Sequence, residues 1–206
     1  MCTRFYIDYS EKNMREILEG VENSKLLDRF RAAGPMKLVT DGEVCPTDIV
    51  GVIAPNPAGN PQVYPMRFGF RMPEGRKPLL NARVETAAEK PAFRDAWKSH
   101  RCIVPASWYF EWEHRKGTDG KVSLGDKYLF QPKGTVVTYL CGLYRILDGL
   151  PEMVILTRES AGDAGRIHDR MPLILPGTAV SRWIRPDTDP DTLLPLALTD
   201  MMQEKA

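Results

Sequence analysis

The sequence has few of the residues that usually build metal sites or disulfide frameworks. Its 206 residues include four cysteines and three histidines, and no two cysteines form a C-x-x-C pair. This scatter argues against a zinc site and against a disulfide scaffold, and the histidines lack ligand spacing. We therefore expect neither a metal nor a cofactor.

Long apolar runs and a strong charge of either sign are also missing. No stretch approaches the roughly 18 apolar residues of a membrane span, and the first twenty residues do not resemble a signal peptide. With 43% hydrophobic and 27% charged residues, the composition is typical of a globular protein. We expect a cytoplasmic protein, nucleoid-associated if bacterial, with no membrane association and no obligate protein partner.

The net charge of +1 does not by itself indicate a nucleic-acid binder, but the charges are unevenly distributed. Between Met66 and Arg101 there are nine basic and four acidic residues, whereas five acidic residues and one lysine follow from Asp187 onward. A local basic face could contact a few phosphates. A solvated surface of mixed charge is the simpler interpretation of the same pattern.

Short apolar runs separated by turn residues predict a fold rich in strands. Strands are expected at 48–55, 62–70, 101–104, 108–114, 127–131, 135–144, 152–157 and 172–176. Helices are expected after a Ser10 N-cap, around Leu26 to Phe30, and at 91–100 and 178–184. We predict one α+β domain over 1–206, with a mainly antiparallel curved or barrel-like sheet and a loosely held segment beyond about residue 185.

Cys2 differs chemically from the other cysteines because of its position. If Met1 is removed, Cys2 carries an α-amine (pKa about 8) and a thiol (pKa about 8.5) on adjacent carbons. Such an aminothiol converts an aldehyde first to a Schiff base and then to a five-membered thiazolidine. An ordinary second residue of a frayed terminus is the alternative. Three internal cysteines are expected to be small buried residues, namely Cys45, Cys102 and Cys141.

Two further residues could assist such chemistry. His168 lies between a polar loop and an apolar strand, where an imidazole could sit at the edge of a pocket, whereas His100 and His114 are expected on the surface. Glu111 is surrounded by aromatic residues in WYFEWEH and is a candidate for a raised pKa and acid–base work. A solvent-facing strand position is the alternative for Glu111.

Taken together, four motifs resemble the SRAP (SOS-response-associated peptidase) family, also described as abasic-site processing proteins. They are MCTRF at 1–5, NARVET at 81–86, RCIVPASWYFEW at 101–112 and ILT…IHDRMPLIL from 155 to 175. Each is weak alone, but their combination and order are specific, and they cover most of the chain up to about residue 185.

The resemblance implies a site and a substrate. Cys2 would bond covalently to the sugar aldehyde of an abasic site in single-stranded DNA, and Asn81 would position the opened sugar. Glu111 would transfer protons during Schiff-base formation, and His168 would assist ring opening and reversal. The resemblance further implies a set of DNA contacts at Arg4, Pro46, Arg83, Thr157 and Arg170.

The sequence also departs from the family pattern. Thr3 replaces the usual glycine after Cys2, only Pro46 matches the N-x-A-P segment, and MRFGFRMP lacks the tryptophans often found there. Phe68 or Phe70 could stack on bases in their place. Two other activities remain open: a thiol peptidase acting on its own N-terminus, and an N-terminal-nucleophile amidotransferase.

Overall fold

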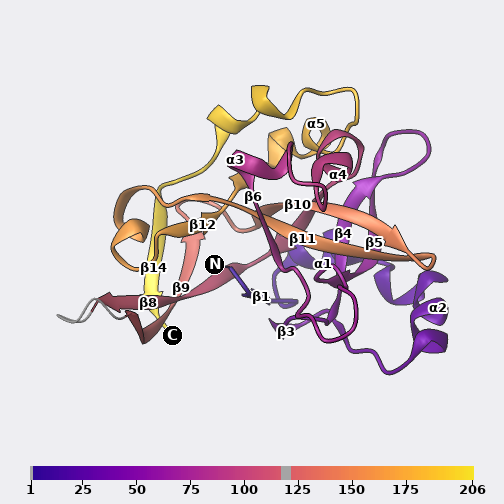
Figure 1. Ribbon diagram of the computed structural model, residues 1–206, viewed down its shortest axis with the longest axis horizontal. Helices are drawn as coiled ribbons and strands as arrows, with labels where there is room; N and C mark the ends of the chain where they lie inside the picture. Colours follow the sequence, from indigo (N-terminus) through magenta and orange to yellow (C-terminus); the bar gives the residue numbers. More distant parts are fainter. Residues whose placement is uncertain (1, 117–121) are drawn as a thin grey trace.

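The computed structural model describes residues 2–116 and 122–206 and contains two β-sheets with short helices around them (Figure 1). The smaller sheet has the strand order β14-β9-β8-β1-β3. Its strands are β1 (Arg4–Ile7), β3 (Gly42–Val44), β8 (Trp108–Lys116), β9 (Val122–Pro132) and β14 (Met201–Lys205). The strand pairings of this sheet are antiparallel.

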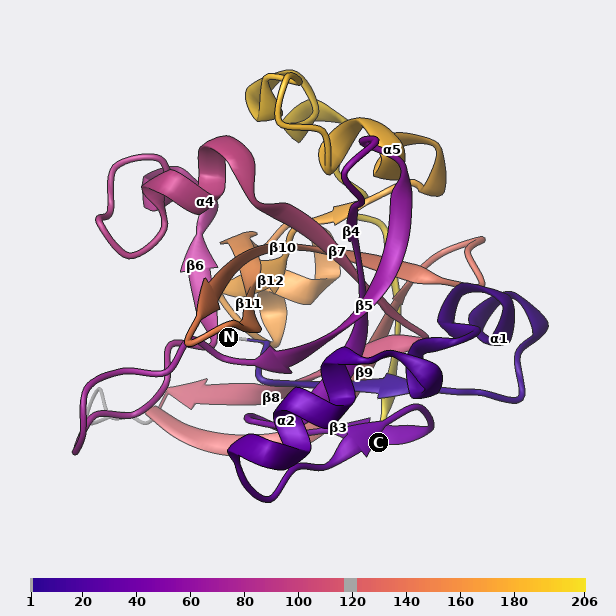
Figure 2. The same ribbon diagram turned by 90° about the vertical axis from the view of Figure 1, so that its right-hand side faces the viewer.

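The larger sheet closes on itself into a barrel-like core. Its strand order is β12-β11-β5-β4-β7-β10-β13, and β10 also pairs with β11, so five strands complete a ring (Figure 2). The strands are β2 (Leu38–Val39), β4 (Ile49–Pro55), β5 (Pro61–Phe68), β6 (Asn81–Arg83), β7 (Arg101–Ala106), β10 (Thr138–Leu147), β11 (Leu150–Glu159), β12 (Arg170–Pro172) and β13 (Ile174–Leu175). The prediction of a mainly antiparallel, barrel-like α+β domain is confirmed, with parallel pairing confined to β2–β4, β5–β11 and β6–β11.

Ser107 joins the two sheets at the point where β7 ends and β8 begins. Its backbone N–H donates to Tyr6 O at 2.8 Å, and its hydroxyl oxygen accepts from the Asp8 N–H at 2.9 Å. Its carbonyl accepts from the Thr138 hydroxyl at 2.9 Å. This buried corner fixes β1, and therefore the start of the chain, between the barrel and β8.

Short helices cover the outside of the barrel. They are α1 (Lys12–Leu18), α2 (Leu26–Ala33), α3 (Val84–Ala87), α4 (Arg94–Ser99) and α5 (Val180–Trp183), with 3-10 turns at η1 (Val21–Asn23), η2 (Gly162–Arg166), η3 (Gly177–Ala179), η4 (Pro190–Thr192) and η5 (Leu194–Leu196). Helix α1 packs closely on β4, because a Cβ at Gly51 would lie 2.5 Å from a methyl carbon of Leu18. Among the described residues, no helix combines the length and apolarity that a bilayer crossing demands.

One local prediction is wrong. Ser10 does not cap α1: its hydroxyl donates to Asp8 Oδ1 at 2.6 Å, and Glu11 occupies the N-cap position without a side-chain bond. In the segment beyond residue 185, Leu193 is fully buried and β14 pairs along β9. Apolar residues between the acidic positions of this segment provide the contacts that net charge alone did not reveal.

Candidate functional site

Cys2 lies at the meeting point of the two sheets, immediately before β1. Its carbonyl accepts a hydrogen bond of 2.8 Å from Asn81 Nδ2. Asn81 is held in turn by β6, which runs parallel to β11 with Asn81 opposite Ile155. The Cys2 side chain is fully buried in the main hydrophobic core, and its thiol faces the Arg4 carbonyl at 3.8 Å.

Glu111 and His168 lie beside this terminus. Glu111 projects from β8 and is 3% exposed, and His168 follows the turn η2 and is 5% exposed. The nearest carboxylate oxygen of Glu111, Oε2, is 3.8 Å from His168 Nε2. The solvent-facing alternative for Glu111 is therefore wrong. The structure brings together all four residues that the sequence singled out for chemistry.

Burial shifts the proton affinities of these groups in the directions that disfavour charge. It raises the pKa of Glu111 to about 7, so this carboxyl exists in both protonation states near neutral pH. It lowers the pKa of His168 to about 4, so the imidazole is neutral at pH 7. Burial also raises the pKa of the Cys2 thiol far above its usual range, and the charge of Glu111 raises it further. At neutral pH the thiol is protonated.

The backbone after His168 fixes the orientation of its ring. The Arg170 N–H donates to His168 Nδ1 at 2.9 Å, so this nitrogen accepts and the neutral ring carries its proton on Nε2, toward Glu111. Asp169 Oδ1 is 3.0 Å from the same Nδ1, and the Asp169 side chain is 79% exposed. The segment His168-Asp169-Arg170 therefore holds the His168 ring with its Nε2–H directed toward Glu111, beside Cys2.

The residues expected to contact DNA surround the site but differ in accessibility. Arg83 is exposed, whereas Thr157 is fully buried on β11. Arg4 is 38% exposed and donates to Glu43 Oε1 at 3.0 Å and to Cys45 Sγ at 3.1 Å. Pro46 is half-buried.

Arg170 is already engaged by protein groups. Its side chain is 12% exposed and forms a bidentate pair with Glu85, at 2.7 and 2.8 Å, while Nη2 also donates to Thr157 O at 2.7 Å. The Arg170 guanidinium holds the pKa of Glu85 below its usual range. Glu85 was not singled out from the sequence, although it belongs to the NARVET motif.

His114 is a second residue that the sequence interpretation missed. It was expected on the surface, but it is half-buried and its ring centroid is 4.0 Å from that of His168. The backbone N–H of His114 donates to the Ile167 carbonyl at 2.9 Å, and this bond aligns the segment before His168 with β8. Ligand atoms of His114, His168 and Asp169 all lie within 4.8 Å of one another, so the fold creates a possible metal-ligand set that sequence spacing did not indicate.

The basic and aromatic residues between 66 and 101 differ from the expectation. Phe68 and Phe70 are fully buried, so neither can stack on a base. Arg101 is 1% exposed and donates to carbonyls around α4 and α5, including Trp183 O at 2.8 Å and Trp97 O at 2.6 Å. Both phenylalanines considered for base stacking, and Arg101 among the basic residues, are therefore buried parts of the core.

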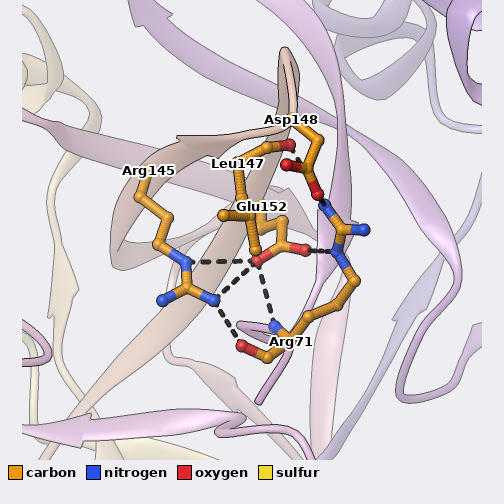
Figure 3. Close-up of polar contacts among 5 residues, drawn as sticks. All are labelled: Arg71, Arg145, Leu147, Asp148 and Glu152. Carbon is orange, nitrogen blue, oxygen red and sulfur yellow. Dashed lines mark hydrogen bonds and ion pairs between the residues drawn. The ribbon is translucent and has the colours of Figure 1, made fainter. Parts of the chain in front are cut away.

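Arg71 is also occupied, in a charged cluster at the other end of β11 from Thr157. Figure 3 shows Arg71 and Arg145 on either side of Glu152, whose carboxylate is fully buried. Arg145 Nη2 donates to Glu152 at 3.0 Å, Arg71 Nε donates to the other oxygen, and Arg71 Nη2 reaches Leu147 O at 3.0 Å. This cluster ties the β10–β11 turn to the segment that leads toward Asn81.

Comparison with protein families identifies the chain. The family described as SOS response associated peptidase (SRAP) matches residues 1–206. The chain belongs to the SRAP family. Curated relatives include the abasic site processing proteins YobE and YoaM of Bacillus subtilis, each 34% identical over 154 residues. These alignments cover 69% of this chain and 68% and 66% of the two relatives.

Other SRAP relatives and solved structures are more distant. The abasic site processing protein YedK of Escherichia coli is 32% identical over 114 residues, covering 53% of this chain and 49% of its own. A phage-related protein from Bordetella bronchiseptica has a TM-score of 0.71 at 20% identity, covering all of this chain and 94% of its own. A protein from Bacteroides thetaiotaomicron has a TM-score of 0.69 at 21% identity, covering 99% and 91%. These structures support the fold.

Proposed function

We propose that this SRAP protein captures abasic sites in single-stranded DNA through Cys2, once removal of Met1 has exposed its α-amine. The observation that carries the proposal is the meeting of Cys2, Asn81, Glu111 and His168 at one junction of the two sheets. The curated relatives, which are named abasic site processing proteins, support the same substrate. The adduct would shield the lesion during a DNA damage response.

The chemistry proceeds in two balanced steps. The Cys2 amine adds to the C1′ aldehyde of the opened sugar, and loss of one water gives a Schiff base. The thiol then adds across this C=N bond: sulfur bonds to carbon, the thiol proton ends on nitrogen, and a thiazolidine results. An abasic sugar has already lost its base, so capture requires only that the sugar be exposed.

Glu111 carries the proton transfers, and His168 assists by hydrogen bonding. During ring opening, neutral His168 donates a hydrogen bond from Nε2–H to the sugar ring oxygen, while protonated Glu111 gives that oxygen a proton and takes one back from the C1′ hydroxyl. Asn81 positions the terminus through the Cys2 carbonyl. With its pKa raised to about 7, Glu111 accepts a proton from the attacking amine and returns one to the departing hydroxyl. A group whose pKa lies near the working pH performs both transfers efficiently.

The order in which the amine and the thiol react favours capture over the peptidase alternative. A thiol peptidase needs a thiolate nucleophile at the first step, whereas burial keeps the Cys2 thiol protonated. Capture begins with the amine and uses the thiol only after the imine exists. Since the Cys2 side chain is fully buried here, capture requires the terminal residue to turn toward the DNA.

Several surrounding residues would hold the DNA strand. Arg83 is exposed beside Asn81 on β6 and is suited to a phosphate next to the lesion. Arg4 and Arg170 would exchange their carboxylate partners, Glu43 and Glu85, for phosphates. Pro46 and Thr157 complete the proposed set of contacts.

The test mixes Met1-processed protein with uracil-glycosylase-treated single-stranded DNA and detects the adduct by denaturing electrophoresis and intact mass. Wild type should give a denaturation-resistant adduct that needs no reductant. Cys2→Ala retains an α-amine, so it should cross-link only when borohydride traps the imine. Equal cross-linking by wild type and Cys2→Ala without reductant would exclude the thiazolidine.

A second arm separates chemistry from binding and from self-processing. His168→Ala should slow adduct formation far more than it weakens non-covalent DNA binding, and equal losses would make His168 a binding residue only. Protein made without methionine aminopeptidase should retain Met1 and fail to capture. Loss of Met1 under that condition would instead favour the autopeptidase.

A further inference from the structure

His114, His168 and Asp169 form a compact group of metal-ligating side chains at the edge of the site. The two imidazoles come from distant parts of the chain, yet their ring centroids are 4.0 Å apart with an interplanar angle of 47°. The hydrogen bond from the backbone N–H of His114 to the Ile167 carbonyl creates this proximity, because it pairs the segment before His168 with β8. Asp169 follows directly, with its carboxylate 3.0 Å from His168 Nδ1.

The donor types select a class of ion. Two imidazoles and one carboxylate suit Zn²⁺ and similar transition ions, whereas Mg²⁺ and Ca²⁺ favour oxygen ligands alone. Metal–ligand bonds of about 2.0–2.1 Å place two tetrahedral ligands about 3.3 Å apart. The distance between His168 Nδ1 and Asp169 Oδ1 already approaches this value, at 3.0 Å.

The third ligand needs only a modest movement. The ligand atoms of all three residues lie within 4.8 Å of one another, and the Asp169 side chain is 79% exposed, so it has room to rotate toward the two imidazoles. An ion on His168 Nδ1 would replace the hydrogen bond from the Arg170 N–H. The ion would therefore occupy the nitrogen that now fixes the orientation of the ring.

We propose that His114, His168 and Asp169 bind a Zn²⁺-type divalent transition ion. The ion and abasic DNA then compete, because the ion would displace the Arg170 N–H bond that orients the His168 ring for capture; this second statement rests on the proposed function. A metal-loaded protein would leave abasic sites uncaptured, and removal of the metal would restore capture.

Metal binding is tested with Co²⁺, whose visible absorption reports nitrogen and oxygen ligands. Cys2→Ala protein is the parent in this experiment, because the terminal aminothiol of Cys2 would itself chelate the ion. The parent should bind one Co²⁺ saturably, and adding His114→Ala or Asp169→Asn should weaken binding at least tenfold. Asp169→Asn alters an exposed side chain and therefore tests the site even if His114→Ala fails to fold.

His100→Ala is the matched control, since His100 is exposed and bonds to Ser99. Its Co²⁺ affinity should equal that of the parent. The site is refuted if Asp169→Asn and folded His114→Ala bind Co²⁺ as tightly as the parent. It is also refuted if His100→Ala abolishes Co²⁺ binding.

Competition is tested on the protein with Cys2 intact. One equivalent of Zn²⁺ should slow adduct formation at least tenfold in wild type, but much less in Asp169→Asn. Equal slowing in both proteins would assign the inhibition to the aminothiol and overturn the competition. If no adduct forms even without metal, the proposed function fails while the Co²⁺ result stands on its own.

Discussion

Two buried glutamates occupy opposite surroundings in this protein. Glu152 is fully buried between Arg71 and Arg145, which donate to both of its oxygens (Figure 3). Glu111 is 3% exposed and faces His168, whose ring burial keeps neutral. Two guanidiniums pair with Glu152 in a structural cluster, whereas burial raises the pKa of Glu111 to about 7 and suits it to proton transfer.

The largest expected effect is on the chemistry of Glu111. Glu111→Gln keeps the shape of the side chain but removes its titratable carboxyl, so capture should slow by roughly 10²–10⁴-fold. Adduct formation on single-stranded abasic DNA measures the rate. Glu113→Gln is the control, because Glu113 lies on the same strand and pairs with Arg115 at 2.8 Å. Capture by Glu111→Gln at the wild-type rate would remove the distinction between the two buried glutamates.

The next effect concerns the stability that Glu152 provides. Glu152→Gln removes the buried carboxylate shared by two half-buried guanidiniums and leaves Arg71 only the exposed Asp148, which should lower the free energy of unfolding by roughly 3 kcal/mol. Urea unfolding measures this loss, while the folded fraction should still capture at the wild-type rate. Asp148→Asn, at a side chain 75% exposed, should change stability by about 0.5 kcal/mol or less. A catalytic defect in fully folded Glu152→Gln would contradict a structural role.

The pH dependence of stability sharpens the comparison. The pKa of Glu111 in the folded protein, about 7, lies above its ordinary value of 4.5. Its contribution to the free energy of unfolding is therefore fully present below pH 4.5 and is lost as pH rises toward 7. Glu111→Gln should therefore gain stability relative to wild type over this range, by on the order of 2–3 kcal/mol. The contribution of His168, whose pKa is lowered, largely cancels in this difference. A difference that does not change with pH would contradict the raised pKa.

The smallest effect is expected at Glu85, which is 46% exposed. Glu85→Gln should cost about 0.5–1 kcal/mol of stability, because it weakens a partly exposed ion pair with Arg170. The same change should tighten non-covalent DNA binding slightly, since Arg170 would be released toward phosphate. Glu89→Gln, at an exposed position, is the control. Weaker DNA binding by Glu85→Gln would instead show that the pair preorganises the site.

The strands of the barrel were predictable because local apolar pattern determines them. The expected strands at 48–55 and 152–157 correspond to β4 and β11, whose buried side chains are contiguous in sequence. Short strands such as β1, β3 and β14 were missed, since they owe their extended form to partners far away in the chain. Local pattern therefore identifies the core better than it identifies the edges.

The candidate site was predictable only in part. Motifs pointed to Cys2, Asn81, Glu111 and His168, which the fold brings together. His114 was placed on the surface because a polar turn follows it, and only the tertiary bond to Ile167 shows otherwise. Phe68 or Phe70 was considered as a stacking residue in place of the missing tryptophans, but both are fully buried. Whether an aromatic side chain meets solvent depends on packing that a single sequence does not reveal.

The last strand of the chain has a consequence for the behaviour of the protein at high concentration. Strand β14 covers the outer edge of β9 over five residue pairs, from Met201 opposite Pro132 to Lys205 opposite Tyr128. Deleting it would leave a long row of backbone amides and carbonyls open to a neighbouring molecule, a known route to edge-to-edge aggregation. Strand β14 thus replaces the edge of the eleven-residue β9 with a five-residue edge that carries Glu204 and Lys205, and a protein trimmed of β14 should self-associate more readily than the full chain.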